Sequence, residues 1–258
     1  MTLDLPPEMP AWLRQRTDAY ARHPLVRRPV LRSRFARFAG VQPGNRVLDV
    51  GTGPGYNAFA FARRGARVEA IEWRREFVPL AGREVIRRRL RTVQVIEADP
   101  VALPFPGRSF DIVTCAAVLH HLPSPLPALQ EMDRVCRIGG HLAIEEVVAS
   151  EQPVRARYHN RMERLRDRSH QRLLSLSELT GALAAAGLTV RRAEVQDSVR
   201  EFNEWVGVTR PPVRRSEHIR RLLQGSVEQD LSGLAVWAED DTFLFVQQVA
   251  WILAERRD

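Results

Sequence analysis

The chain has 258 residues, of which 44% are apolar and 27% charged, and its formal net charge is +8. This composition is ordinary for a globular protein and is long enough for one large α/β domain. No run of 18 apolar residues occurs, so no membrane span is expected. The first ten residues lack a basic segment followed by an apolar stretch, so we predict no secretory signal and expect a cytoplasmic location.

Cysteine and histidine show neither a disulfide framework nor a metal-ligand pattern. Cys115 and Cys136 stand in apolar segments and are expected to be buried thiols. His120 and His121 are adjacent, and adjacent residues of a helix or strand point in different directions. We therefore expect no metal.

All 39 basic residues are arginine. A GC-rich genome would explain this bias without any functional meaning. An arginine-rich face would suit a nucleic acid. The arginines are scattered along the chain, however, and aromatic residues are not interleaved with them as stacking platforms. We therefore do not expect nucleic acid to be a partner.

In chain order, residues 11–38 are predicted to be helical, with a break at Pro24. An alternation of strands and helices follows. Strands are predicted at 46–50, 68–72, 93–97, 110–115 and 141–147, and helices at 54–64, 77–89 and 126–136. Such an alternation is typical of right-handed βαβ units and predicts a mostly parallel, doubly wound sheet.

The pattern changes after residue 150. We predict helices at 151–170, 177–187, 200–206 and 216–223, and strands at 188–195, 242–245 and 249–254. Ser175 or Ser177 is expected near the N-cap of the second of these helices. No linker separates this part from the first, so the prediction is a single domain.

The first predicted strand runs directly into a glycine-rich turn, Gly51-Thr52-Gly53-Pro54-Gly55, and a helix follows. Such a turn lets a ligand approach the backbone and aims the helix N-terminus at it. Glu72 ends the next strand, 21 residues after Gly51. In doubly wound folds an acidic residue at that place accepts hydrogen bonds from ribose hydroxyls. The turn therefore predicts a nucleoside cofactor.

Asp49 narrows the choice of cofactor. It lies two residues before the turn, where a carboxylate would repel the pyrophosphate of a dinucleotide and attract a cation. S-adenosylmethionine (SAM) brings an ammonium and a sulfonium instead. A G-x-G-x-x-G fingerprint would also need glycine where Tyr56 stands. The alternative is a plain tight turn, with Asp49 a satisfied polar group and Glu72 a solvated strand end.

Four segments in order resemble the class I SAM-dependent methyltransferases, in particular the branch typified by ubiquinone and menaquinone biosynthesis methyltransferases. They are VLDVGTGPGYNAFAFA, VEAIEW, EADPVALPFPGRSFDIVTCAAVLHHL and RVCRIGGHLAIEE, and they span about residues 45–147. The resemblance implies a Rossmann-like α/β fold with an antiparallel C-terminal strand and a helical cap over the pocket. We divide the predicted single domain into an N-terminal helical cap (1–40), a cofactor-binding core (41–150), a substrate cap with late α/β elements (151–225) and C-terminal strands (226–258).

The resemblance also implies SAM as cofactor, S-adenosylhomocysteine as product, and a set of cofactor-binding residues. The set is Asp49, Gly51, Thr52, Gly53, Gly55, Glu72, Trp73, Asp99, Pro100 and Ala116. The turn would surround the methionine part, with Asp49 beneath its cationic end, and Glu72 would bind the ribose. Trp73 and Asp99 would contact the adenine, and the Ala116 carbonyl would accept from the ammonium.

Two departures from the family pattern stand out. Pro100 occupies a position where a small residue is usual, and proline has no N–H to donate. Arg137 and Ile138 replace the usual lysine or leucine followed by proline before the double glycine.

In methyl transfer the cofactor supplies the reactive group and the protein aligns the reactants, an effect worth roughly 7–11 kcal/mol. A general base is needed only for an acceptor that arrives protonated. His121 is the predicted candidate, and His170 and Glu145 are weaker ones. Each has a structural alternative. His121 would only cap or line the pocket, His170 would end a solvated helix, and Glu145 would be a carboxylate at the end of the sheet.

Residues 11–38 and 151–225 are expected to fold over the carboxyl ends of the strands, where ligands bind in open α/β sheets. Five side chains there either line an acceptor pocket or form core, with core slightly favoured: Trp12, Tyr158, Met162, Phe202 and Trp205. The leading hypothesis is a methyltransferase with a small-molecule acceptor. An RNA methyltransferase, a SAM-binding protein without methyl transfer and, last, a nicotinamide-dependent oxidoreductase are the alternatives. No oligomeric state is indicated.

Overall fold

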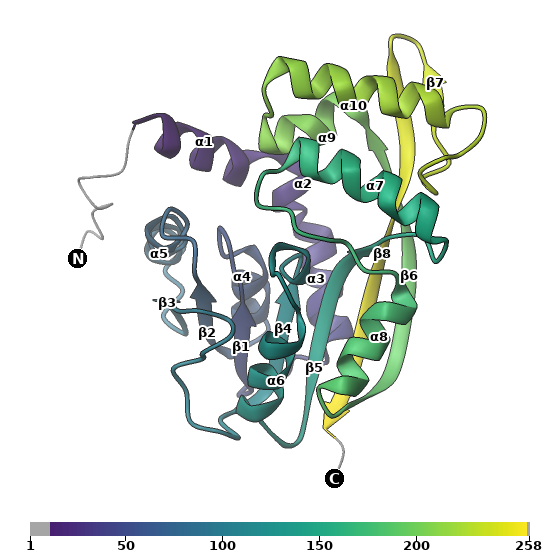
Figure 1. The fold of residues 1–258 in the computed structure, drawn as a ribbon. Helices are drawn as coiled ribbons and strands as arrows, with labels where there is room; N and C mark the ends of the chain where they lie inside the picture. The colour runs from purple at the N-terminus through teal and green to yellow at the C-terminus, as the bar shows by residue number, and fades with distance from the viewer. Residues whose placement is uncertain (1–10, 257–258) are drawn as a thin grey trace.

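A computed structural model describes residues 11–256 (Figure 1). Its centre is an eight-stranded sheet with the order β3-β2-β1-β4-β5-β8-β6, and β7 pairs with β8. The strands are β1 (Arg46–Val50), β2 (Arg67–Glu72), β3 (Val93–Glu97), β4 (Phe110–Ala116), β5 (Cys136–Val148), β6 (Leu188–Glu201), β7 (Trp237–Glu239) and β8 (Thr242–Arg256). Strands β1 to β5 are parallel, and β8 runs antiparallel to both β5 and β6. The predicted doubly wound sheet with an antiparallel C-terminal strand is confirmed.

Helices cover both faces of the sheet (Figure 1). They are α1 (Ala11–Arg22), α2 (Pro24–Arg27), α3 (Pro29–Phe38), α4 (Tyr56–Arg63), α5 (Val78–Arg87), α6 (Leu126–Val135), α7 (Pro153–Arg166), α8 (Leu176–Ala185), α9 (Phe202–Thr209) and α10 (Val213–Ser226), with a 3₁₀ turn η1 (Leu119–His121). Strand residues alternate between the two faces. In β1, Val47 packs among α3 and α4 side chains, whereas Leu48 joins the cluster beneath α6 and α8.

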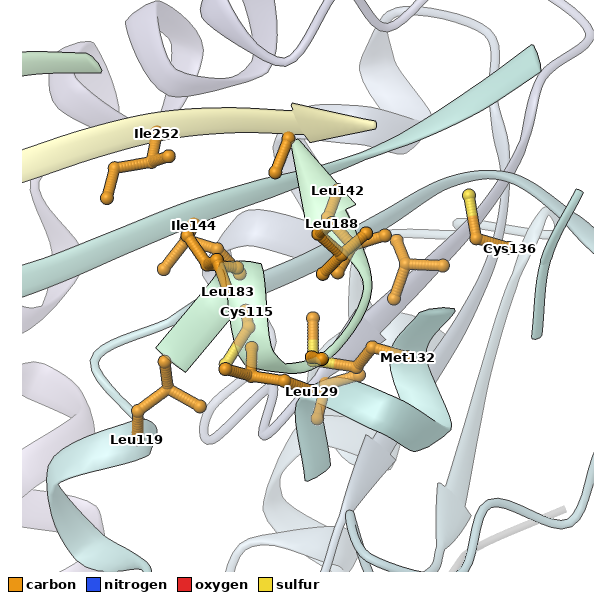
Figure 2. Close-up of a cluster of buried hydrophobic side chains, with 14 of the residues drawn as sticks. Cys115, Leu119, Leu129, Met132, Cys136, Leu142, Ile144, Leu183, Leu188 and Ile252 are labelled. Atoms are coloured by element: carbon orange, nitrogen blue, oxygen red, sulfur yellow. The ribbon is translucent and has the colours of Figure 1, made fainter. Parts of the chain in front are cut away.

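Figure 2 shows the second of these clusters, in which side chains of α6 and α8 meet those of β4, β5 and β8. Leu129, Met132 and Leu183 come from the helices and are fully buried. Cys115 and Cys136 lie in the same cluster as free thiols, as predicted. Burial raises the pKa of Cys136 to about 12. Neither thiol is therefore placed to act as a nucleophile.

The late strands are longer than predicted. Strand β6 pairs with β8 from Leu188 as far as Glu201, and β8 is one strand although 242–245 and 249–254 were predicted as two. Gln247 and Gln248 interrupt the apolar pattern, yet both stay in the ladder, opposite Ser198 and Asp197. In the second half of β6 the half-buried positions Glu194, Gln196 and Ser198 are polar, whereas Val195 and Val199 are exposed, so the sequence lacks the apolar pattern that would have revealed the full length of the strand.

Beyond the sheet's core, the extended ends of β6 and β8 carry a small layer made by α7, α9 and α10 (Figure 1). Its apolar centre includes Met162, Phe202, Ile219 and Phe245. Helix α7 ends at Arg166, four residues before the predicted end, so His170 stands in the following loop. No helix within residues 11–256 is long and apolar enough to cross a membrane.

Candidate functional site

The turn after β1 is built around glycine. Gly51, Gly53 and Gly55 have φ values of +69°, +54° and +90°, a region that side chains with a Cβ rarely adopt. At Gly51 a Cβ would also come within 2.3 Å of Val118 Cγ2 and 2.8 Å of Trp73 Cζ3. The predicted strand–turn–helix arrangement is therefore present, and its backbone faces two side chains from neighbouring strand ends.

Asp49 is a buried carboxylate at the base of this turn. It is 1% exposed and accepts hydrogen bonds from the hydroxyls of Thr52 (2.7 Å) and Thr114 (3.0 Å). Burial outweighs these hydrogen bonds and raises the pKa of Asp49 to about 6. No arginine or histidine of the described chain forms an ion pair with it. A cationic group placed near Asp49 would offset the cost of this buried charge.

Glu72 reaches the same turn from the end of β2. It is fully buried, so the alternative of a solvated strand end is wrong. One carboxylate oxygen accepts from the N–H of Gly53 at 2.8 Å. The other accepts from the Arg74 N–H at 2.9 Å and from its Nε at 3.3 Å. Glu72 thus joins the glycine turn to β2 directly.

The remaining predicted cofactor residues lie at neighbouring strand ends. Trp73 is half-buried against Gly51, and the Arg74 guanidinium lies over its ring. Exposed Asp99 follows β3 in a loop that is held to β2 by a hydrogen bond from the Ala98 N–H to the Glu72 carbonyl. Pro100 beside it is buried, and Ala116 is the last residue of β4.

These groups fit an adenosyl cofactor by their chemistry. The glycine turn admits no Cβ at position 51, and two buried carboxylates flank it. Asp49 has no counter-ion among the residues described, as expected for a site that receives a cation. Within residues 11–256, no group of three or more His, Cys, Asp or Glu side chains is arranged to hold a metal ion.

A second polar cluster, which the sequence did not predict, lies at the ends of β4 and β5. Glu146 is 3% exposed and accepts from the Leu119 N–H at 2.8 Å, and its other oxygen lies 2.7 Å from His120 Nδ1. Burial alone would lower the pKa of His120, but the Glu146 charge and hydrogen bond raise it. The signal was present in the sequence, because two adjacent acids in the apolar strand LAIEEVV are unusual.

His121, the predicted proton-transfer group, stands beside His120 with ring centroids 4.1 Å apart. Its Nδ1 lies 3.0 Å from the Ser169 hydroxyl, which donates in turn to Asp167 at 2.7 Å. Burial, followed by the charges of His120 and Arg74, lowers the pKa of His121 to about 2. His121 is therefore neutral across the whole physiological pH range.

The two weaker base candidates are held by structural contacts. Glu145 accepts from Arg32 Nη1 and Trp251 Nε1, both at 2.8 Å. His170 does not end a solvated helix, because it is 5% exposed and its Nε2 lies 2.9 Å from Asn160 Oδ1. Burial lowers the pKa of His170 to about 4.

A cavity of about 170 Å³ lies next to these residues. Helices α1, α2, α3, α7 and α9 and the ends of β5, β6 and β8 line it, and Ala117, His120 and His121 lie in its wall. Trp205 lines it, whereas Tyr158, Met162 and Phe202 belong to the apolar cluster beneath α10. The Trp12 side chain lies outside the described residues. A larger hollow of about 460 Å³, between α7 and the start of α8, contains none of the predicted cofactor residues.

Comparison with known proteins gives consistent matches. A family model described as "Methyltransferase domain" matches residues 48–144. The uncharacterized methyltransferase YcgJ of Bacillus subtilis (strain 168) is 30% identical over 175 residues, which is 68% of this chain and 69% of the relative. A crystal structure of YcgJ aligns with a TM-score of 0.81 at 26% identity, over 86% of this chain and 96% of that one. A ubiquinone biosynthesis O-methyltransferase of Aeromonas salmonicida (strain A449) is 29% identical over 154 residues, 57% of this chain and 64% of the relative.

A doubly wound sheet with a glycine turn after β1 and an acid at the end of β2 defines an α/β protein that binds a nucleoside cofactor. The match to YcgJ across two thirds of both chains makes the assignment specific. The chain belongs to the SAM-dependent methyltransferases; it is a transferase, and SAM is its cofactor.

Proposed function

We propose that the protein transfers the methyl group of SAM to a small-molecule acceptor bound in the 170 Å³ cavity. The observation that carries this proposal is the position and size of the cavity beside the ends of β4 and β5. Sites for small molecules usually measure roughly 300–1,000 Å³, so this one suits a compact acceptor. The relatives named for ubiquinone biosynthesis support a small-molecule acceptor.

In this proposal the cofactor residues keep the roles that the resemblance implies. The glycine turn accommodates the methionine part, and Asp49 stabilises its cationic end from beneath. Glu72 accepts from the ribose hydroxyls through the oxygen that has only the Gly53 N–H as partner, because its other oxygen already accepts from both the N–H and the Nε of Arg74. Trp73 packs near the adenine, and Asp99 accepts from its amino group. SAM supplies a methyl group activated by a sulfonium.

The chain's own contribution is alignment and exclusion of water. The cap formed by α1, α2, α3 and α9 lines one side of the cavity, and we expect it to direct an acceptor held there toward Ala117 and the end of β4. Within residues 11–256 the one side-chain hydrogen bond of neutral His121 is that of Nδ1 with Ser169, so its other ring nitrogen is the one that would accept a proton from a hydroxyl acceptor. Its low pKa makes it a weak base, so proton transfer is expected to contribute less than alignment.

The test uses SAM carrying a tritiated methyl group. The wild-type protein is incubated with a fraction of small metabolites below about 1 kDa and, separately, with total RNA. We expect label in the small-molecule fraction, and at least tenfold less label there with Glu72→Gln at a subsaturating concentration of SAM, because its cofactor contact is weakened. Label in RNA instead would contradict the proposal and favour an RNA methyltransferase. Cofactor binding without any label transfer would favour a SAM-binding protein without methyl transfer.

A further inference from the structure

Arg200, near the end of β6, is a buried cation without a counter-ion. Its side chain is 92% removed from solvent, since the residue is 8% exposed, and it lines the 170 Å³ cavity. The single hydrogen bond that its side chain forms within residues 11–256 runs from Nε to Gln247 Oε1 at 3.1 Å. Gln247 is fixed in turn, because its Nε2 donates to Glu163 at 2.9 Å. Both Nη nitrogens of Arg200 therefore keep their donors for another partner.

The other arginines around the cavity fall into two groups. Arg32 pairs with Glu145 at 2.8 Å, and Arg166 pairs with Glu163 at 2.7 Å. Arg28 is only half-buried, but like Arg200 its side chain has no ion pair within the described part of the chain. Burial, and then the charges of Arg28 and Arg166, lower the pKa of Arg200 to about 10. Two guanidinium groups of this cavity thus lack a carboxylate.

The carboxylates of the cavity wall are already engaged. Glu145 binds Arg32 and Trp251, and Glu146 binds His120 and the Leu119 N–H. Asp167 accepts from Ser169. Outside the wall, Glu204 is close enough to act on the pKa of Arg28 and Arg200, but it is exposed and pairs with neither in the described structure. The charge of Glu163 also acts on the pKa of Arg200, but Glu163 pairs with Arg166, so no acid of the described chain forms an ion pair with Arg200.

A buried guanidinium without a partner is costly, and its planar fork matches the oxygens of a carboxylate or a phosphate. We propose that Arg200, with Arg28 beside it, binds an anionic group of the methyl acceptor, either a carboxylate or a phosphate monoester. The inference rests on the proposed function, since it takes the cavity to be the acceptor site. The acceptor is then a compact organic acid, with its apolar part against Leu25, Leu31 and Trp205 and its methylated atom toward Ala117.

The first experiment titrates the protein saturated with S-adenosylhomocysteine with four aromatic probes. Benzoate and phenyl phosphate carry the anion, and benzamide and benzyl alcohol are their neutral counterparts. We expect the anions to bind at least tenfold more tightly than the neutral probes. Tighter binding of phenyl phosphate than of benzoate identifies a phosphate monoester, and the reverse order identifies a carboxylate. Failure of both anions to bind at millimolar concentration, or equal binding of benzamide, overturns the inference.

Substitutions locate the effect. Arg200→Gln is expected to weaken binding of the anionic probes at least tenfold, while S-adenosylhomocysteine binding changes less than twofold. Arg191→Gln is the matched control, because Arg191 lies on the same strand but pairs with Glu255 on the surface. Unchanged anion binding by Arg200→Gln overturns the inference. If the wild type does not bind S-adenosylhomocysteine, that result would instead contradict the cofactor site on which the proposed function rests.

Thermal unfolding separates a binding role from a structural one. If Arg200 is retained for a ligand, Arg200→Gln removes an uncompensated buried charge, and the ligand-free protein should melt at the same or a higher temperature than the wild type. A purely structural arginine would behave in the opposite way. A lower melting temperature for Arg200→Gln, combined with unchanged anion binding, would assign Arg200 to packing alone.

Discussion

Asp49 and Arg200 are both buried, both charged and both without a counter-ion among the residues described, but they stand in different halves of the site. Asp49 lies beneath the glycine turn at the first strand, in a parallel part of the sheet. Arg200 lies on the last strand in the sheet order, where β6 and β8 extend beyond the core. Burial shifts both pKa values toward the neutral form, upward for Asp49 and downward for Arg200.

This contrast shows how one cleft can receive two ligands of opposite charge. The anionic half suits a cofactor that carries an ammonium and a sulfonium, and the cationic half suits an acceptor that carries an acid. Between them, Glu146 and His120 form a neutralised pair. Each unpaired charge weakens the folded protein on its own and is offset only when its ligand binds. The following changes test that separation, from the largest expected effect to the smallest.

The largest effect is expected for Asp49→Asn, measured as unfolding free energy against pH without cofactor. Asp49 titrates at about 6 when folded and at 3.8 ordinarily. Below pH 3.8 it is protonated in both states and costs nothing. As the pH rises from 3.8 to 6 the unfolded state loses its proton first, so the wild type loses stability, by up to about 3 kcal/mol. Asp49→Asn should equal the wild type at pH 4 and exceed it at pH 8.

The same variant tests whether Asp49 interacts with the ammonium group of the cofactor. Asp49→Asn should weaken SAM and S-adenosylhomocysteine at least tenfold in calorimetry, because both carry the ammonium, and leave adenosine unchanged. An Asp49→Asn protein that is less stable than the wild type at pH 8, with unaltered cofactor affinity, would mean that Asp49 is only a satisfied core group.

Glu72→Gln is expected to cost about 1.5–3 kcal/mol of cofactor affinity, since one charged acceptor of the ribose hydroxyls is lost. In contrast to Asp49→Asn, it should weaken adenosine as much as S-adenosylhomocysteine. Glu69→Gln is the matched control on the same strand, because Glu69 pairs with Arg46 away from the turn. Equal effects of the two glutamine variants would show that the loss is a general consequence of changing β2.

The cofactor half could be predicted from the sequence because its determinants are local. Asp49 and the glycine turn follow one another in the chain, and Glu72 ends the next strand, so the alternation of strands and helices places them at one edge of the sheet. The sequence showed Glu146 as an acid in an apolar strand but could not identify its partner. That partner, His120 of η1, lies 26 positions earlier in the chain and contacts Glu146 only in the folded protein.

The acceptor half could not be predicted, because it is assembled from distant segments. Arg200 is one of 39 arginines, and nothing local distinguishes it from Arg191 on the same strand. Arg200 contacts the uncharged Gln247, 47 residues later, and not a carboxylate. This contact exists only because β6 pairs with β8. Arg28 lies at the junction of α2 and α3 with a φ of +28°, which no residue pattern indicated. Whether a charged side chain has a partner depends on tertiary contacts, so the unpaired state of these arginines could be found only from the structure.

The smallest effect is expected for His121→Asn. With a pKa of about 2, His121 is neutral from pH 5 to 9, so its loss should lower kcat less than tenfold and leave the pH profile of kcat unchanged. The measurement is the rate of methyl transfer to the acceptor found by the tritium assay. A hundredfold loss, or the disappearance of an inflection near pH 6 to 7, would show that His121 is a principal general base and that its pKa rises when the acceptor binds.

The most direct test of the opposed charges is a calorimetric titration of the wild type, Asp49→Asn and Arg200→Gln with S-adenosylhomocysteine, with NAD as the comparison ligand. We expect micromolar binding of S-adenosylhomocysteine to the wild type and to Arg200→Gln, binding at least tenfold weaker to Asp49→Asn, and no binding of NAD. Binding of NAD, or a loss of S-adenosylhomocysteine affinity in Arg200→Gln but not in Asp49→Asn, would contradict the assignment of the cofactor to the acidic half of the site.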